Sequence, residues 1–243
     1  MTPRAPRFYS EARLREGTTC ALPEESAHHA VRVLRLRAGD DVTLFDGHGG
    51  EYGARIASIE RTRVAIDVLD HRGVERESPL RVLLVQGVSS GERMDFTVRK
   101  AVELGVAEIH PVIAAASVAR PKGERAAARH EHWQRIAIAA CEQCGRNRIP
   151  KVLPLVPLSG YRAQGDGLKL LLSPLSRTAL SKIAVKGDEF VIAAGPEAGF
   201  NSAEEAALVQ AGFVPVQLGA RILRTETAAL AALAALNALR GDF

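Results

Sequence analysis

The sequence predicts an α/β protein in which a small β-barrel domain precedes a larger domain built on a mainly parallel sheet. The chain has 243 residues, of which 47% are hydrophobic and 25% are charged, which is enough to bury one large core or two modest ones. The first 72 residues contain short stretches with rough period-two alternation. The remainder alternates continuous apolar runs with helical segments, a pattern typical of a parallel sheet.

Charge and cysteine content narrow the function classes. The chain carries 32 basic and 28 acidic residues, a net charge of +4, which permits a nucleic-acid partner without requiring one. An odd count of three cysteines indicates a reducing compartment. The longest apolar stretch, residues 228–239, is shorter than the roughly 18 residues that span a bilayer. We therefore expect a cytoplasmic protein without a membrane partner.

In the N-terminal part, the pattern predicts one helix around residues 28–36 and three strands. The Gly47-His-Gly-Gly50 string is a turn signal after the first of them. A polar stretch over 71–79 is expected to link the two domains, 1–72 and 73–243. The expected strands are 41–46, 51–59 and 63–69.

In the C-terminal part, continuous apolar runs are typical of strands covered on both faces. We expect strands at 80–86, 109–113, 168–172, 190–194 and 214–218. The intervening segments predict helices at 91–104, 124–144, 175–185, 202–211 and 225–239.

Two glycine-bearing loops follow consecutive strands of this sheet. The first contains Gly195-Pro196 and Ala198-Gly199, ahead of a helix whose start has capping-box spacing. The second contains Gly219 and the Arg221–Arg224 segment. Ligands of open α/β sheets bind outside the carboxyl ends of the strands, where glycine lets backbone approach closely. The alternative is an ordinary tight turn in the first loop and a capped helix with solvated arginines in the second.

Other signatures are absent from the sequence. It contains no dinucleotide-binding G-x-G-x-x-G after the first strand of the second domain, no P-loop and no G-x-S-x-G elbow. Cys141 and Cys144 form one C-x-x-C at the end of a predicted helix, and no second pair completes a zinc site. We expect these cysteines to pack in the interior, and we predict no metal.

A basic cluster spans residues 120–151, with eight basic residues against three acidic ones. Such a run is either a solvated face or a footprint for a phosphate backbone, and the sequence does not decide between the two. The basic residues are Arg120, Lys122, Arg125, Arg129, Arg135, Arg146, Arg148 and Lys151.

Five strings together resemble the ribosomal RNA small subunit methyltransferase E family of the SPOUT superfamily. The resemblance runs in family order from Arg7-Phe8 to the C-terminus. It implies a PUA-like RNA-binding β-barrel over 1–72, a SPOUT methyltransferase domain with a C-terminal trefoil knot over 73–243, and a homodimer. The strings are Val33–Asp40, Arg99–Val106, Glu142–Arg146, Gly195–Phe200 and Leu218–Ala228.

The resemblance also implies an activity. Members use S-adenosylmethionine to methylate N3 of a uridine in 16S rRNA, which we expect to be presented within an assembled or assembling small ribosomal subunit. The uracil N3 proton has to leave, because the imide anion is the good nucleophile. The competing hypotheses are an RNA-binding assembly factor with a vestigial pocket and a nucleotide-dependent oxidoreductase, which cofactor-binding measurements would separate.

The family pattern assigns site residues. Arg224 is expected to contact uracil or phosphate, and Glu197 to be a carboxylate in the pocket that acts in catalysis or orients the loop. RNA contacts are expected from Arg7, Arg35 and Arg146. The expected cofactor-binding residues are Leu172, Ser173, Gly195, Pro196, Glu197, Leu218, Gly219, Ile222, Leu223 and Thr227.

The chain departs from the family pattern at two places. Family members usually have the motif Gly-Pro-Glu-Gly-Gly, and Ala198 stands at its fourth position, where they have glycine. If that residue has a positive φ, alanine costs about 1 kcal/mol there. Many relatives also carry lysine before the glycine of the first loop, where this chain has Ser90-Gly91.

Overall fold

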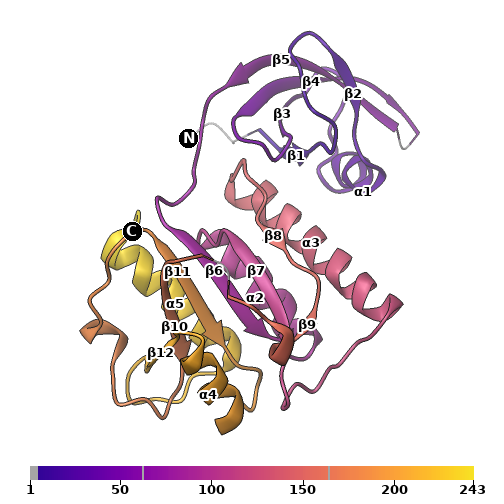
Figure 1. The fold of residues 1–243 in the computed structure, drawn as a ribbon. Coiled ribbons are helices and arrows are strands. Elements are labelled where there is room, and N and C mark those ends of the chain that lie inside the picture. Colours follow the sequence, from indigo (N-terminus) through magenta and orange to yellow (C-terminus); the bar gives the residue numbers. More distant parts are fainter. Residues whose placement is uncertain (1–4, 62, 164) are drawn as a thin grey trace. The chain divides into compact units, whose positions relative to one another are not determined.

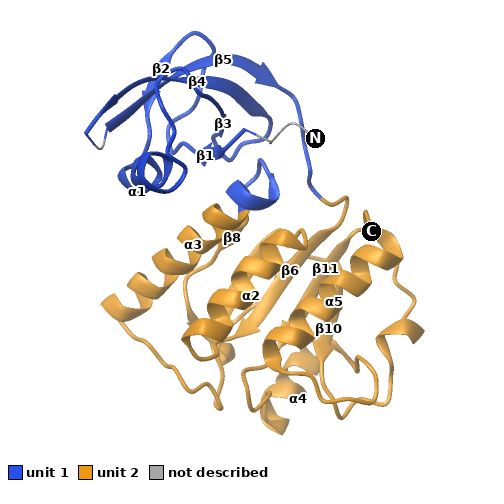
Figure 2. Ribbon diagram, turned by 180° about the vertical axis from the view of Figure 1, so that it is seen from behind, with its two compact units in different colours: residues 1–77, 141–149 blue, residues 78–140, 150–243 orange. Residues whose placement is uncertain are grey.

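The computed structural model describes residues 5–61, 63–163 and 165–243, and the chain divides into two compact units (Figures 1 and 2). The first unit comprises residues 1–77 and 141–149, and the second comprises 78–140 and 150–243. The sequence analysis placed a single boundary after residue 72. The structure adds to the first unit a distant segment, 141–149, whose Glu142 accepts a hydrogen bond from the Tyr9 backbone N–H at 2.9 Å.

The first unit is a five-stranded sheet in the order β1-β3-β4-β5-β2. β1 runs parallel to β3 and every other neighbour is antiparallel. The sheet packs around an apolar core that includes Phe8, Leu44, Ile56 and Ile66. The strands are β1 (Arg7–Tyr9), β2 (Thr19–Ala21), β3 (Asp41–Phe45), β4 (Glu51–Glu60) and β5 (Arg63–Arg72).

The predicted helix of this unit differs in its bounds and its form. It begins earlier, as α1 (Glu24–His28), and ends in a π-helical turn, η1 (His29–Val33). The turn arises because the Leu34 N–H reaches the carbonyl of His29, five residues back, at 3.0 Å. Arg35 follows with φ of 56°, a left-handed conformation that non-glycine residues adopt at some cost.

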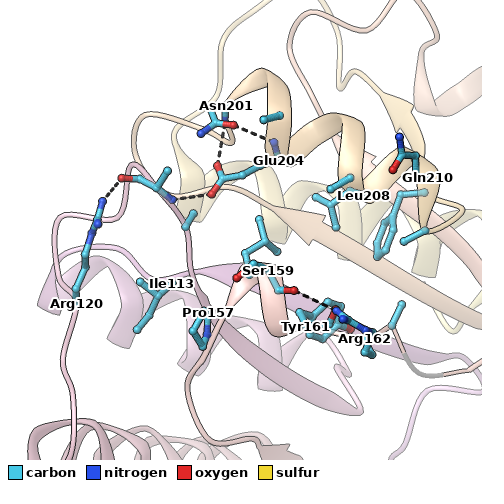
Figure 3. A pocket seen from close by; sticks show the side chains of 18 residues that line it. Ile113, Arg120, Pro157, Ser159, Tyr161, Arg162, Asn201, Glu204, Leu208 and Gln210 are labelled. Carbon is cyan, nitrogen blue, oxygen red and sulfur yellow. Dashed lines mark hydrogen bonds between the residues drawn. The ribbon is translucent and has the colours of Figure 1, made fainter.

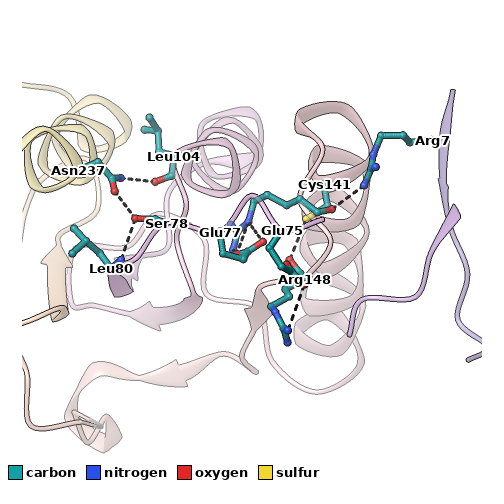
Figure 4. A network of polar contacts seen from close by, with 10 residues as sticks. Arg7, Glu75, Glu77, Ser78, Leu80, Leu104, Cys141, Arg148 and Asn237 are labelled. Carbon is teal, nitrogen blue, oxygen red and sulfur yellow. Dashed lines mark hydrogen bonds and ion pairs between the residues drawn. The ribbon is translucent and has the colours of Figure 1, made fainter. Parts of the chain in front are cut away.

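A buried ion-pair network holds the first unit together. Glu51 receives hydrogen bonds from Arg7 at 2.5 Å and from Arg76 at 2.9 Å. Arg7 also donates to the Asn147 side chain at 2.6 Å, and Arg146 pairs with Glu77 (Figure 4). The network satisfies each buried charge, which is the condition for a charged group to be tolerated inside a protein. It also attaches the segment 141–149 to the β-sheet.

The second unit contains the mainly parallel sheet that the sequence predicts, in the order β12-β10-β11-β6-β7-β8, with β9 beside β7. Each recorded strand pair is parallel. The two-residue strands β8 and β9 were not predicted. The strands are β6 (Arg81–Gly87), β7 (Glu108–Ile113), β8 (Lys151–Val152), β9 (Val156–Pro157), β10 (Leu168–Leu172), β11 (Glu189–Ala194) and β12 (Val214–Val216).

Helices cover both faces of this sheet (Figure 2). α2 (Gly91–Glu103), α3 (Glu124–Cys144) and α5 (Thr225–Arg240) lie on one face, and α4 (Ser202–Gln210) packs on the other, next to the 3-10 turn η2 (Leu158–Gly160). Asn237 joins α5 to its surroundings, because it accepts from the Ser78 hydroxyl and donates to the Leu104 carbonyl, each at 2.8 Å (Figure 4). No helix in the described part of the chain is long and apolar enough to cross a membrane.

One predicted helix, over 175–185, is wrong. The segment contains a single 3-10 turn, η3 (Leu180–Lys182). Its backbone groups bond across to the loop after β12, since Gln217 N–H donates to the Thr178 carbonyl and Leu180 N–H donates to the Gln217 carbonyl. Those long-range bonds replace the i to i−4 bonds that a helix needs.

The network predicts that Glu51→Gln destabilises the first unit. The substitution leaves Arg7 buried without its carboxylate, a loss of about 3–5 kcal/mol. Hydrogen exchange followed by mass spectrometry should show faster exchange in β4 and unchanged exchange in β6. The matched control is Asp41→Asn, because Asp41 pairs with Arg55 on the surface and such pairs contribute under about 1 kcal/mol.

The ion pair between Glu51 and Arg7 should also make the first unit sensitive to acid. Burial alone raises the pKa of Glu51, but hydrogen bonds from Arg76 and Arg7 outweigh burial and leave the pKa below its ordinary value of 4.5. A lowered folded-state pKa stabilises the protein fully above 4.5, and this stabilisation is lost as the pH falls through the folded-state pKa. The difference in free energy of unfolding between wild type and Glu51→Gln should therefore shrink as the pH falls below 4.5. A difference that does not change with pH would contradict the assignment.

Candidate functional site

Four loops meet at the carboxyl edge of the parallel sheet. The strand order places the ends of β12, β10, β11 and β6 next to one another, so the segments that follow these strands are neighbours. Backbone hydrogen bonds join two of them directly, because Ser173 N–H donates to the Val216 carbonyl at 3.0 Å. Both predicted glycine loops lie at this edge.

A small cavity of about 60 Å³ lies between the loops after β10 and β12. Five of the predicted cofactor residues line it: Leu172, Ser173, Leu218, Gly219 and Leu223. The remaining lining residues were not among the predicted cofactor residues; they are Pro174, Val216, Gln217, Arg221 and Ala228.

The other predicted cofactor residues lie outside the cavity lining. Ile222 points to solvent and is 86% exposed, and Thr227 is exposed on the first turn of α5. Gly195, Pro196 and Glu197 belong to the loop after β11, next to the end of β6. These five residues therefore do not form the wall of the cavity.

The glycines of this edge permit very close packing between loops. A Cβ at Gly87 would lie 2.5 Å from the Pro196 nitrogen, and one at Gly195 would lie 2.7 Å from the Phe200 nitrogen. Gly219 has φ of 98° and Gly199 has φ of 76°. Ala198 is not among the described residues with positive φ, so alanine causes no left-handed strain at this departure from the family pattern.

A buried polar residue that the sequence analysis missed joins three of these segments. Gln86, at the end of β6, is fully buried. Its Nε2 donates to Thr225 Oγ1 at 3.0 Å, and the Thr225 hydroxyl donates to the Gly195 carbonyl. The available signal was a glutamine at the end of an otherwise apolar run, Leu80–Gln86.

Glu197 connects the loop after β11, to which it belongs, with the start of α2. Its Oε1 accepts from the Ser90 N–H at 2.8 Å and from Arg93 at 3.3 Å. Burial alone raises the pKa of Glu197, but hydrogen bonds to the Ser90 N–H and to its own backbone, with the Arg93 charge, hold the pKa below its ordinary value. Glu197 is therefore ionised at neutral pH, and its other oxygen, Oε2, is buried without a hydrogen-bond partner.

The predicted arginines fall into two groups. Arg224 is the N-cap residue of α5, is exposed and enters no ion pair in the described part of the chain. Arg35 is likewise exposed. Arg7 and Arg146 are buried in the ion pairs of the first unit. An RNA contact by Arg7 or Arg146 does not fit this burial, because each guanidinium would first have to leave its carboxylate.

A larger cavity, of about 750 Å³, lies on the other face of the sheet, beside α4 (Figure 3). Its walls include Leu158, Tyr161, Leu208 and Phe213, and none of the predicted cofactor residues lines it. Arg120 lies at its edge, where the guanidinium donates to the Ala115 carbonyl. The cavity beside the glycine loops is therefore the smaller of these two cavities.

Metal and thiol chemistry have little basis among the described residues. They contain no cluster of three or more His, Cys, Asp or Glu that could hold a metal ion. Cys141 is buried, and burial raises its pKa to about 12. A thiol with that pKa is protonated at neutral pH and unreactive, which agrees with the predicted packing role.

Family models match both parts of the chain. A model described as RNA methyltransferase domain matches residues 76–237, and one described as RNA methyltransferase PUA domain matches residues 22–69. The ribosomal RNA small subunit methyltransferase E of Buchnera aphidicola is 33% identical over 98% of this chain and 95% of its own length. The enzyme of that name from Bacillus subtilis is 30% identical over 96% of each chain.

Solved structures agree with this similarity. A protein from Legionella pneumophila, in complex with the bound cofactor SAM, superposes with a TM-score of 0.95 at 37% identity, over 99% of this chain and all of that one. The ribosomal RNA small subunit methyltransferase E from Neisseria gonorrhoeae, bound to S-adenosyl methionine, gives 0.90 at 42% identity, with the same coverage.

The close packing of the loops predicts the effect of a single methyl group. Gly195→Ala should destabilise the second unit by about 1–3 kcal/mol, because the added Cβ meets backbone that cannot move aside. Denaturant unfolding followed by the fluorescence of the single tryptophan, Trp133, reports on this unit. The control is Gly91→Ala, where a Cβ meets open space; equal stability of the two variants would refute the packing argument.

Proposed function

This chain belongs to the ribosomal RNA small subunit methyltransferase E family, and we propose that it transfers the methyl group of S-adenosylmethionine to N3 of a uridine in 16S rRNA. The observation that carries the proposal is the meeting of the loops after β10, β11 and β12 at one edge of a parallel sheet. Relatives at 37% and 42% identity over nearly the whole chain hold this cofactor.

The residues at this edge fit the cofactor chemically. Leu172, Leu218 and Leu223 would offer apolar surface to the cofactor, and the exposed backbone near Gly219 would offer amide and carbonyl groups. The cavity of about 60 Å³ is well below the roughly 300 Å³ of the smallest typical ligand pockets. The cofactor would therefore extend beyond this cavity along the edge of the sheet. S-adenosylmethionine, when bound, supplies an electrophilic methyl group on a sulfonium centre.

Arg224 is proposed to act on the uracil. Its guanidinium is exposed at the start of α5 and has no carboxylate partner in the described chain. When uracil N3 loses its proton, negative charge develops on the adjacent carbonyl oxygens. A guanidinium placed there stabilises that charge more strongly in the transition state than in the ground state.

Glu197 is proposed to be a positioning residue. A carboxylate with a lowered pKa is a weak base at neutral pH, and its Oε1 already binds the Ser90 N–H and Arg93. These bonds attach the loop after β11 to the first turn of α2. Glu197 therefore orders the loop on which Gly195 and Pro196 lie.

We propose that the first unit binds rRNA, within an assembled or assembling small ribosomal subunit in the cytoplasm. The PUA-domain match supports this role, and Arg35 is exposed two residues after Val33, an apolar side chain that is 60% exposed. We assign Arg7 and Arg146 to the stability of this unit instead. The trefoil knot that the family resemblance implies for the C-terminal part belongs to this proposal too.

A homodimer is also part of the proposal. Leu175 and Ile222, on the loops that border the cofactor cavity, are each 86% exposed. Large apolar side chains gathered at one place commonly mark an interaction site. Light scattering at micromolar protein should give the mass of a dimer, and a fully active monomer would contradict this assignment.

The activity itself is tested with unmodified 16S rRNA and small subunits from a strain that lacks this methyltransferase. Transfer of label from S-adenosylmethionine, followed by mass mapping of the modified nucleotide, should identify a single 3-methyluridine. Calorimetry should show S-adenosylmethionine binding. Cofactor binding without transfer to either substrate would favour an assembly factor and overturn the proposal.

Arg224→Ala should fold, bind S-adenosylmethionine within a few-fold of wild type and lose most methylation. Removal of one such donor costs about 2.7–4 kcal/mol, roughly a hundred- to a thousand-fold in rate. Arg224→Lys should recover little, because an ammonium cannot reproduce the planar fork. Single-turnover methylation is the measurement, and a near-normal rate for Arg224→Ala would remove this residue from the mechanism.

A further inference from the structure

The first two turns of α3 border an open groove that none of the preceding assignments uses. Its volume is about 510 Å³, and its lining includes four basic side chains, Arg120, Arg125, Arg129 and His132. The rest of the lining consists of two alanines, one from α3, and Pro121. We refer to this feature as the α3 groove, and it lies entirely within the second unit.

Helical spacing places the charges of the groove on one side. Arg125, Arg129 and His132 stand at positions i, i+4 and i+7 of α3, which is one face of a helix. Ala128 lies between them and leaves the space above it open. Arg120 approaches from the preceding loop, where its Nε donates to the Ser117 carbonyl at 3.2 Å, so its guanidinium is held in place by backbone.

Two charges of the groove, those of Arg125 and Arg129, are not neutralised by a carboxylate in the described chain. Arg125 and Arg129 are exposed and enter no ion pair in the described chain, and the groove lining contains no carboxylate. The His132 side chain is bound to a carboxylate, since Asp95 accepts hydrogen bonds from His132 at 2.9 Å and from Trp133 at 3.1 Å. Asp95 is thus occupied by α3 residues other than the two arginines.

Helix stability does not explain these arginines. Arg125 lies in the first turn of α3, where the helix dipole is positive and a cation is unfavourable. An anion placed against the same turn would be attracted both by the dipole and by the arginine forks. The arrangement is therefore one that gains stability when a negatively charged group enters the groove.

We propose that the α3 groove binds phosphate groups of the rRNA backbone, as a contact of the second unit separate from the first unit and from the cofactor loops. The inference rests on the proposed function, since that function makes RNA the polyanion that this chain meets. Planar guanidinium forks match phosphate oxygens, and phosphate contacts position a nucleic acid without reading its sequence. The groove would hold the rRNA while Arg224 acts on the uracil.

The test compares two double variants of the full-length protein. Arg125→Gln/Arg129→Gln removes two charges from the α3 groove. Lys182→Gln/Lys186→Gln removes two charges from the segment between β10 and β11, outside the α3 groove. The probe is an unmodified 16S rRNA transcript, and its dissociation constant is measured at several salt concentrations. Calorimetry with S-adenosylmethionine verifies that each variant is folded.

The groove variant should bind the transcript roughly tenfold or more weakly at 0.1 M salt, with a salt slope reduced by about 1.4–1.8, the value for two lost phosphate contacts. The affinity of both variants for S-adenosylmethionine should stay within twofold of wild type. The control variant should also bind the transcript within twofold of wild type. Unchanged rRNA affinity in the groove variant, or an equal loss in the control, would overturn the inference. An acidic protein as the true occupant would give the first of these outcomes.

Failure of the inference and failure of the proposed function give different results. If wild type methylates 16S rRNA but the groove variant binds the transcript normally, only the phosphate site is wrong. If wild type binds S-adenosylmethionine and the transcript but transfers no methyl group, the methylation proposal is wrong, whereas the phosphate site stands or falls by the variant's affinity. If wild type does not bind the transcript, both are overturned.

Discussion

The geometry of the candidate site depends on one fully buried side chain, Gln86, at the end of β6. Its amide bonds to Thr225, 139 positions later in the chain, and Thr225 bonds to the Gly195 carbonyl. A buried polar group without a partner costs about 1–3 kcal/mol, so the hydrogen bonds of Gln86 Nε2 and of the Thr225 hydroxyl stabilise the arrangement of these three segments. Arg224 directly precedes Thr225, and its backbone is therefore fixed relative to the loop that contains Gly195.

Close approach of backbone is the second constraint at this edge, and it explains why the loops are rich in glycine. Gly87 and Gly195 lie where a Cβ would collide with neighbouring backbone, so the loops after β6 and β11 can pack only with hydrogen in place of a side chain. The segment after β10 is held in a different way, by backbone hydrogen bonds. It forms no helix, because its backbone groups bond to Gln217, and these bonds order the loops around the cavity.

Elements with a strong period could be predicted from sequence, and elements defined by distant contacts could not. The helix over Glu124–Cys144 and the strand over Leu168–Leu172 have the predicted bounds, because each has enough residues to display its pattern. The two-residue strands β8 and β9 show no period. The assignment of 141–149 to the first unit depends on contacts such as Tyr9 with Glu142, and these join positions more than a hundred residues apart.

The same limit applies to the arginines, for which sequence shows the charge but not the partner. Arg7 and Arg146 are buried and have carboxylates opposite them, and their charges are used within the fold. Arg125, Arg129 and Arg224 are exposed and have no carboxylate partner in the described chain. Their charges therefore remain available to a ligand. A protein that must hold a polyanion and also keep a charged network inside a small β-sheet unit uses arginine for both purposes. The presence or absence of an opposing carboxylate, which only the folded chain reveals, distinguishes the two uses.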